Sequence, residues 1–165
     1  MCNLKMPDTK TPRINDYPPA SLIKRLMAFI YDLLLLAGLF MITGALAVIL
    51  PVFIINDGNA IIKGHPFYLI NQIIVLSTLF LSGLVFYAWF WTHGGQTLGM
   101  KTWRIKLISN ETDKISRKQA VIRYFAAVLS WSVVGLGFLW SLIDRKKRCW
   151  HDILSASQLV QLPKK

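Results

Sequence analysis

Cysteine and acidic residues are both scarce in this 165-residue chain, which has two Cys and eight Asp or Glu. Cys2 and Cys149 fall in segments that we expect in the cytoplasm, where structural disulfides are rare. The three histidines are scattered, so the two cysteines lack the partners of a four-ligand zinc site. The sequence therefore predicts no structural disulfide, no metal site and no cofactor.

The shortage of acidic residues leaves a net charge of +11, which first suggests a nucleic-acid partner. The basic residues, however, crowd the flanks of apolar segments, as at Lys24 and Arg25, and are not interleaved with aromatic residues over one face. Anionic lipid headgroups attract such flanking charges by roughly 1 kcal/mol per residue. We therefore expect a lipid bilayer with anionic headgroups to be a partner, and no nucleic acid.

Apolar residues are abundant, at 54% of the chain, and they gather in three long blocks. The blocks cover residues 26–50, 67–91 and 124–143, and each is near or above the roughly 20 residues that a helix needs to cross a bilayer. The first block carries Asp32 and is too long for the apolar core of a signal peptide. The sequence predicts an all-α, multi-pass membrane protein with two full transmembrane helices and a third membrane segment at 124–143.

The distribution of Lys and Arg predicts the topology. Five lie in the N-terminal segment through Arg25, one in the loop 56–66, seven in the connector 92–123 and six in the tail from Asp144. The positive-inside rule then places the N-terminus and the connector in the cytoplasm, at the plasma (inner) membrane. The six positive charges of the tail favour a cytoplasmic C-terminus, which requires the third segment to re-enter, breaking at Gly135 or Gly137; a single span stays the alternative.

The polar, proline-rich residues 1–20 predict a flexible cytoplasmic tail, and residues 21–162 a single membrane domain. Apolar and basic residues alternate over 103–107, which is strand periodicity, and the short apolar stretch 159–162 can pair with that strand. A small cytoplasmic β-element is therefore expected.

Two helix ends can also be predicted. Pro51 marks the far end of the first helix. Ser116 and Gln119 have the spacing of a capping box, which predicts a helix beginning near Arg117.

Three pieces of the chain together resemble the RDD family, membrane proteins of bacterial type named for one arginine and two aspartates. The first piece is Arg25 with Asp32, the second is Gly94-Gly95-Gln96-Thr97-Leu98-Gly99-Met100-Lys101, and the third ends in His151-Asp152. The resemblance implies that Arg25 and Asp32 are the first two motif residues and Asp152 the second aspartate, with Asp144 as the alternative. The family is largely uncharacterised, and transport is the suspected activity.

Asp32 is the most informative residue, because an ionised carboxylate within a membrane helix costs on the order of 2.5–3.5 kcal/mol. Three interpretations remain open: a proton or cation site, an ion pair with Arg25, Arg123 or a tail arginine, or a protonated group bonded to a neighbouring helix. Arg25 can also be a basic anchor that snorkels to the membrane surface. His151 beside Asp152 resembles a general-base pair, but no nucleophile accompanies it, so we expect no enzyme.

Two functions stay open. In the first, a homo-oligomer transports a monovalent cation, a proton or a small solute, with Asp32 as the titrating carboxylate and Arg25 setting its pKa. In the second, the protein is a non-catalytic membrane scaffold or an assembly partner of another membrane protein. The variant Asp32→Asn distinguishes the two functions, because the transport function predicts a normally inserted protein that has lost its activity, and the scaffold function predicts less protein or lost partner binding.

Overall fold

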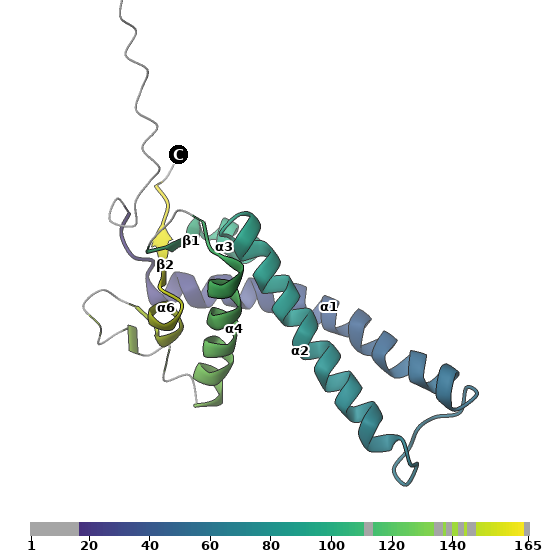
Figure 1. Cartoon of the computed structure of the whole chain (residues 1–165). Helices are drawn as coiled ribbons and strands as arrows, with labels where there is room; N and C mark the ends of the chain where they lie inside the picture. The colour runs from purple at the N-terminus through teal and green to yellow at the C-terminus, as the bar shows by residue number, and fades with distance from the viewer. Residues whose placement is uncertain are drawn as a thin grey trace, which may run out of the picture.

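Two long helices dominate the computed structural model, which describes residues 17–110, 114–133, 137, 140–141, 144 and 148–163. Helix α1 covers Leu22–Ile55 and helix α2 covers Tyr68–His93. They form a hairpin that projects away from the rest of the chain (Figure 1). Both are long and apolar enough to cross a membrane, and most of their large apolar side chains are exposed, as lipid contact requires.

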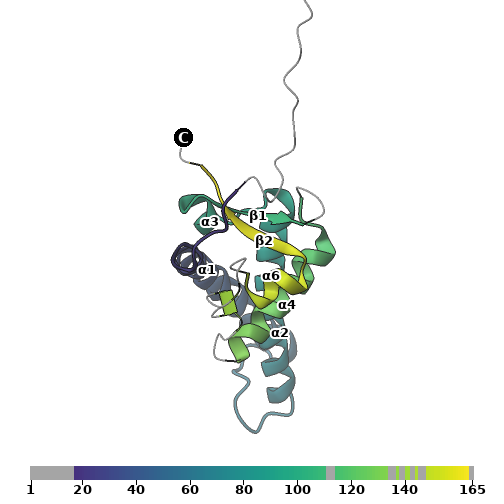
Figure 2. The same ribbon diagram turned by 90° about the vertical axis from the view of Figure 1, so that its left-hand side faces the viewer.

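The remaining elements gather at one end of this hairpin. They are α3 (Leu98–Thr102), β1 (Ile105–Ser109), α4 (Arg117–Ser132), α6 (Trp150–Leu154) and β2 (Ser157–Gln161). Strands β1 and β2 pair antiparallel, with Ile105 opposite Gln161 and Ser109 opposite Ser157. Figure 2 shows the two strands crossing over one end of the molecule, with α6 and α4 below them. We call α3, the two strands and α6 the cap.

The segment before α1 is tied to the last strand. The Ala20 backbone N–H donates to the Leu159 carbonyl at 2.9 Å, and Pro19 forms a bridge with Val160. The residues just before α1 and strand β2 therefore lie side by side, although almost the whole chain separates them in sequence.

The apolar core lies where the beginning of α1, the end of α2 and the cap meet. Its buried members include Ala28, Trp91, Met100, Ile105 and Leu107. Beyond this region α1 and α2 bury little against each other or anything else. The polar groups described below are therefore held by the best-packed part of the molecule.

The predicted strand pairing is confirmed, and so is the helix that begins after Ser116, whose capping box with Gln119 is present. The prediction for Pro51 is wrong, because α1 continues through it to Ile55. Proline removes one backbone donor but does not prevent the next turn. That turn closes through hydrogen bonds from the backbone N–H groups of Asn56 and Gly58 to the Val52 carbonyl, at 3.3 and 3.0 Å.

The third membrane segment stays a prediction. Helix α4 covers the beginning of the block 124–143 and ends at Ser132, and most of the residues from 134 to 147 lie outside the described part. Residues 1–16 of the predicted tail also lie outside it.

Candidate functional site

One face of α1 turns away from lipid. Arg25, Ala28, Asp32 and Leu36 are buried, and their spacing of three or four residues places them on a single helix face. Arg25 is 6% exposed and Asp32 is 2% exposed. The snorkelling interpretation of Arg25 is therefore wrong, because its guanidinium points into the protein.

Asp152 binds two arginines from two different helices. Its Oδ2 atom lies 2.6 Å from Arg25 Nη1, and its Oδ1 atom lies 2.6 Å from Arg123 Nη2. The backbone N–H of Cys149 also donates to Oδ2, at 3.0 Å. Charge-assisted contacts of this length are among the strongest that side chains make. We call Arg25, Arg123 and Asp152 the arginine–aspartate cluster.

Further contacts fix both guanidiniums. Arg25 Nε donates to the Ala20 carbonyl at 3.1 Å, and Arg123 Nη1 donates to Ser157 Oγ at 2.8 Å. The Arg123 guanidinium also lies 5.5 Å from the centre of the Trp91 ring, within range of a cation–π interaction. The arginine–aspartate cluster thus connects α1, α2, α4, α6 and β2.

The cluster has an excess of positive charge. Burial acts to raise the pKa of Asp152, but the charges of Arg123 and Arg25 outweigh it and hold that pKa well below its usual range. Burial, together with the charge of Arg123, lowers the pKa of His151 to about 3, so its imidazole is neutral at pH 7. Two guanidiniums against one carboxylate leave the cluster a net charge of +1.

Asp144 does not reach the cluster. It pairs with Arg148 at 3.1 Å, four residues along the chain and partly exposed. Of the two candidates for the second motif aspartate, Asp152 is the one that contacts Arg25.

Asp32 binds α3, and no ion pair joins it to an arginine within the described residues. Thr97 Oγ1 donates to Asp32 Oδ2 at 2.5 Å, and the Gly99 backbone N–H donates to Oδ1 at 2.9 Å. Thr97 is also the N-cap of α3, because its Oγ1 accepts from the Met100 N–H at 3.2 Å. The ion-pair interpretation of Asp32 is therefore wrong, and its partners come from the glycine-rich connector.

The connector residues have distinct places. A Cβ added to Gly99 would meet the Ala28 carbonyl oxygen and, at 2.9 Å, Asp32 Oδ1, so α3 approaches α1 too closely for a side chain here. Gly95 has a φ of +66°, and its carbonyl accepts from the Leu107 N–H at 2.7 Å. The other predicted residues act locally: Gly94 ends α2, Gln96 donates to the Ile105 carbonyl at 2.7 Å, and Lys101 is exposed.

Cys149, His151 and Asp152 offer ligand atoms within 4.8 Å of one another, the arrangement of a possible metal centre. However, Arg25 Nη1 donates to Cys149 Sγ at 3.3 Å and binds Asp152 at 2.6 Å. A guanidinium thus occupies the side of the carboxylate and sulfur that a metal ion would need. We assign no metal site here.

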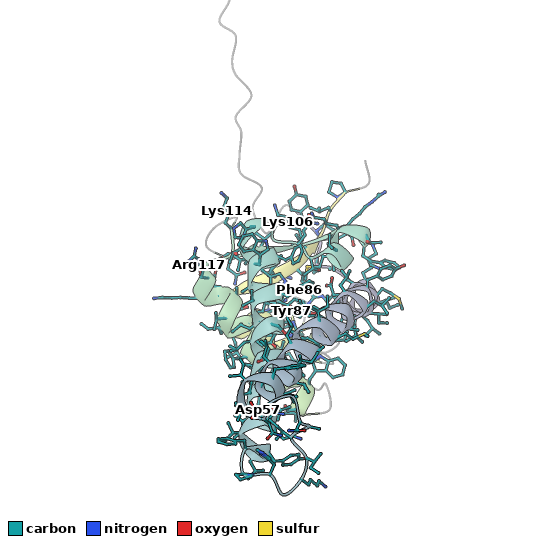
Figure 3. All side chains as sticks on the ribbon, turned by 90° about the vertical axis from the view of Figure 1, so that its right-hand side faces the viewer. Asp57, Phe86, Tyr87, Lys106, Lys114 and Arg117 are labelled. Carbon is teal, nitrogen blue, oxygen red and sulfur yellow. The ribbon has the colours of Figure 1, made fainter. Side chains whose placement is uncertain are left out.

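A cavity of about 580 Å³ lies beside these groups, between α1, α2 and α4. Its walls are almost entirely apolar, and its polar or charged lining residues are Arg25, Asp32, Tyr87, Arg123, Tyr124, Ser132 and His151. Figure 3 shows Tyr87 on α2 between the basic residues Lys106, Lys114 and Arg117 at the cap end and Asp57 at the opposite end. Sequence reasoning missed the aromatic lining of this cavity, to which Tyr87 and Trp91 contribute. Their spacing of four residues, which places them on one face of α2, is the sequence signal that could have revealed it.

Comparisons with known proteins place the chain in a family. Residues 19–156 match the RDD family, a range that includes Arg25, Asp32, the connector and Asp152. The chain is 33% identical over 64 residues to the uncharacterized protein YxaI of Bacillus subtilis (strain 168). That similarity covers 39% of this chain and 42% of YxaI. No solved structure matches.

Proposed function

We propose, since the chain belongs to the RDD family of membrane proteins, that it transports a proton or a small solute across the plasma membrane, with Asp32 as the titrating carboxylate. The observation that carries the proposal is the cavity, which brings Asp32 into contact with a space of ligand size inside a membrane protein. The described part of one copy has two spanning helices, too few to enclose a route, so the transporter is an oligomer.

The hydrogen bonds of Asp32 suit a group that changes its proton. Both of its oxygens accept, from Thr97 Oγ1 and from the Gly99 N–H. A proton on Asp32 Oδ2 would reverse the bond to Thr97, whose hydroxyl can accept as well as donate, and Oδ1 would still accept from the Gly99 N–H. The hydrogen bonds between α1 and α3 can therefore be kept in both protonation states of Asp32.

The charge of the cavity bears on the choice of solute. Arg25 and Arg123 line it, and the carboxylates of Asp152 and Asp32 balance them as long as Asp32 is ionised. Once Asp32 holds a proton, the two guanidiniums exceed the carboxylate of Asp152, so a monovalent metal cation would be repelled and an anionic group attracted. We therefore favour a proton or an anionic solute over Na⁺, K⁺ or Li⁺.

The proposed orientation places both ends of the chain in the cytoplasm. The contacts of Pro19 and Ala20 with β2 support this, since they hold the segment before α1 beside the C-terminal strand. No catalytic role is proposed, because the carboxylate beside His151 is taken up by two arginines.

The test compares purified wild type with Asp32→Asn in liposomes that contain a pH-sensitive dye, under imposed proton, Na⁺, K⁺ and Li⁺ gradients. Asp57→Asn is the matched control, because it removes an exposed carboxylate from the turn after α1. We expect flux in wild type and in Asp57→Asn and loss of flux in Asp32→Asn at an unchanged unfolding temperature. Equal flux in all three proteins, or in empty liposomes, would rule out the proposal.

A scaffold role is the second candidate, and the arginine–aspartate cluster favours it. The cluster uses Arg25, Arg123 and Asp152 entirely within the molecule and builds a rigid cap on two membrane helices. In that case wild type carries no flux, and Asp32→Asn lowers the amount of folded protein or the capture of a partner membrane protein.

A further inference from the structure

The cavity combines apolar walls with charge at one place. Its apolar lining residues include Phe29, Leu33, Trp91, Val128 and Trp131. Its charged part is formed by Arg25 and Arg123 of the arginine–aspartate cluster, next to which His151 also lines the cavity. Its volume of about 580 Å³ is in the range of small-molecule sites. Such a space fits a ligand with a long apolar part and a single polar end.

The cavity lies between α4 and the two helices that are long and apolar enough to span a membrane, α1 and α2. Phe29 on α1 and Trp131 on α4 both line it and contact each other across the gap between these helices, with ring centres 5.3 Å apart. Leu33 and Trp131 are lining residues that are also 49% and 52% exposed. Because these lining side chains are themselves exposed, a molecule dissolved in the apolar layer of the bilayer can reach the cavity beside the Phe29–Trp131 pair without crossing water.

The charged end of the cavity favours an anion. The arginine–aspartate cluster carries a net charge of +1, and Asp32 is the carboxylate that offsets it among the groups lining the cavity. Trp91 is 6% exposed, and its Nε1 donor has no hydrogen-bond partner within the described residues; the same is true of the Tyr87 hydroxyl. Buried donors of this kind gain from an acceptor that a ligand supplies.

We propose that the cavity binds an anionic, single-chain amphiphile from the surrounding bilayer, with its head at the arginine–aspartate cluster and its chain along the apolar walls. The inference rests on the proposed function, since it names the solute class of the same cavity. It also predicts a coupling: neutralising Asp32 leaves the cluster's charge uncompensated, so the anion and a proton on Asp32 bind together. The titratable or charged residues that line the cavity are Arg25, Asp32, Tyr87, Arg123, Tyr124 and His151.

The probe is a brominated long-chain alkyl sulfonate, because bromine quenches tryptophan fluorescence on contact and a sulfonate is charged throughout the pH range used. The protein is placed in phosphatidylcholine nanodiscs and titrated with the sulfonate or with the brominated alcohol of the same chain length. Ala127→Phe fills the cavity from α4, and Leu129→Phe is the matched control, since Leu129 is 58% exposed and does not line the cavity. Ser132→Phe is a second filling variant at the exposed end of α4.

We expect saturable quenching by the sulfonate and at least tenfold weaker binding of the alcohol. Ala127→Phe and Ser132→Phe lose the saturable part, whereas Leu129→Phe retains it, at equal unfolding temperatures. Asp32→Asn, which is neutral at this position, binds the sulfonate several-fold more tightly than wild type. Equal binding of sulfonate and alcohol, or saturable quenching that survives both filling variants, would overturn the inference.

The two proposals can fail separately. Saturable sulfonate binding without any Asp32-dependent flux in liposomes would retain the ligand site and remove the transport function. Asp32-dependent proton flux without saturable binding would retain transport and remove the amphiphile.

Discussion

Arg25 and Asp152 are separated by 127 positions in the sequence, yet Arg25 Nη1 lies 2.6 Å from Asp152 Oδ2. Both side chains are almost completely buried. The contact joins the first helix to the last part of the chain. Because Arg123 binds the other oxygen of the same carboxylate, removal of Asp152 leaves two buried cations together.

Asp152→Asn should therefore destabilise the protein strongly, by about 3–5 kcal/mol, the range for a broken buried ion pair. Asp144→Asn is the matched control, since the Asp144–Arg148 pair is partly exposed and such pairs contribute about 0–1 kcal/mol. Thermal unfolding in detergent, with the amount of folded protein after size exclusion, measures both. A larger loss in Asp144→Asn would mean that Asp144 is the second motif aspartate.

His151 should make stability depend on pH. Its folded pKa is about 3, below the usual value of 6.5, so the unfolded chain takes up a proton that the folded protein does not between these values. The free energy of unfolding should fall as the pH drops from about 6.5 toward 3, and the contribution is fully present above about 6.5. Asp152, whose pKa is also lowered, adds a loss in the same direction below about pH 4.

The measurement is the unfolding temperature between pH 7.5 and 4.5 for wild type and His151→Gln. We expect a flatter profile in the variant, because it has no imidazole to protonate after unfolding. Parallel profiles for the two proteins would show that His151 is not the residue responsible.

Gly99→Ala should separate α3 from α1. The added Cβ would meet the Ala28 carbonyl and Asp32 Oδ1, and crowding of this kind costs about 1–3 kcal/mol. Gly38→Ala is the control on the exposed face of α1, where nothing lies within 4 Å, and it should stabilise the helix by about 0.5–1 kcal/mol. Unfolding temperatures that move in the same direction would contradict the close approach at Gly99.

Thr97→Val should lower the free energy of unfolding, whereas Thr97→Ser should leave it nearly unchanged. Valine removes both the donor to Asp32 and the acceptor for the Met100 N–H, at about 1–3 kcal/mol for each buried group left without a partner. Serine keeps the hydroxyl. Proteolysis of the connector, which contains Lys101 as an exposed trypsin site, reports whether α3 has come loose.

The sequence by itself determined the features that depend on composition and local spacing. Apolar length predicted α1 and α2, and the Ser116–Gln119 capping box predicted where α4 begins, because helix formation and capping involve neighbours three or four residues apart. Alternation around Ile105 predicted a strand, and a short apolar stretch near the end of the chain supplied its partner. The motif residues Arg25, Asp32 and Asp152 could be named because the sequence around them resembles the family's motifs.

Only the tertiary structure decided which of these residues bind one another. Arg25 and Asp32 lie on one face of α1, so spacing alone allowed an ion pair between them. In the folded chain Arg25 binds Asp152 and Asp32 binds Thr97 and Gly99, because the cap brings α6 to one turn of that face and α3 to another. Partners separated by 65 to 127 positions meet through packing of the whole chain, which local spacing does not specify.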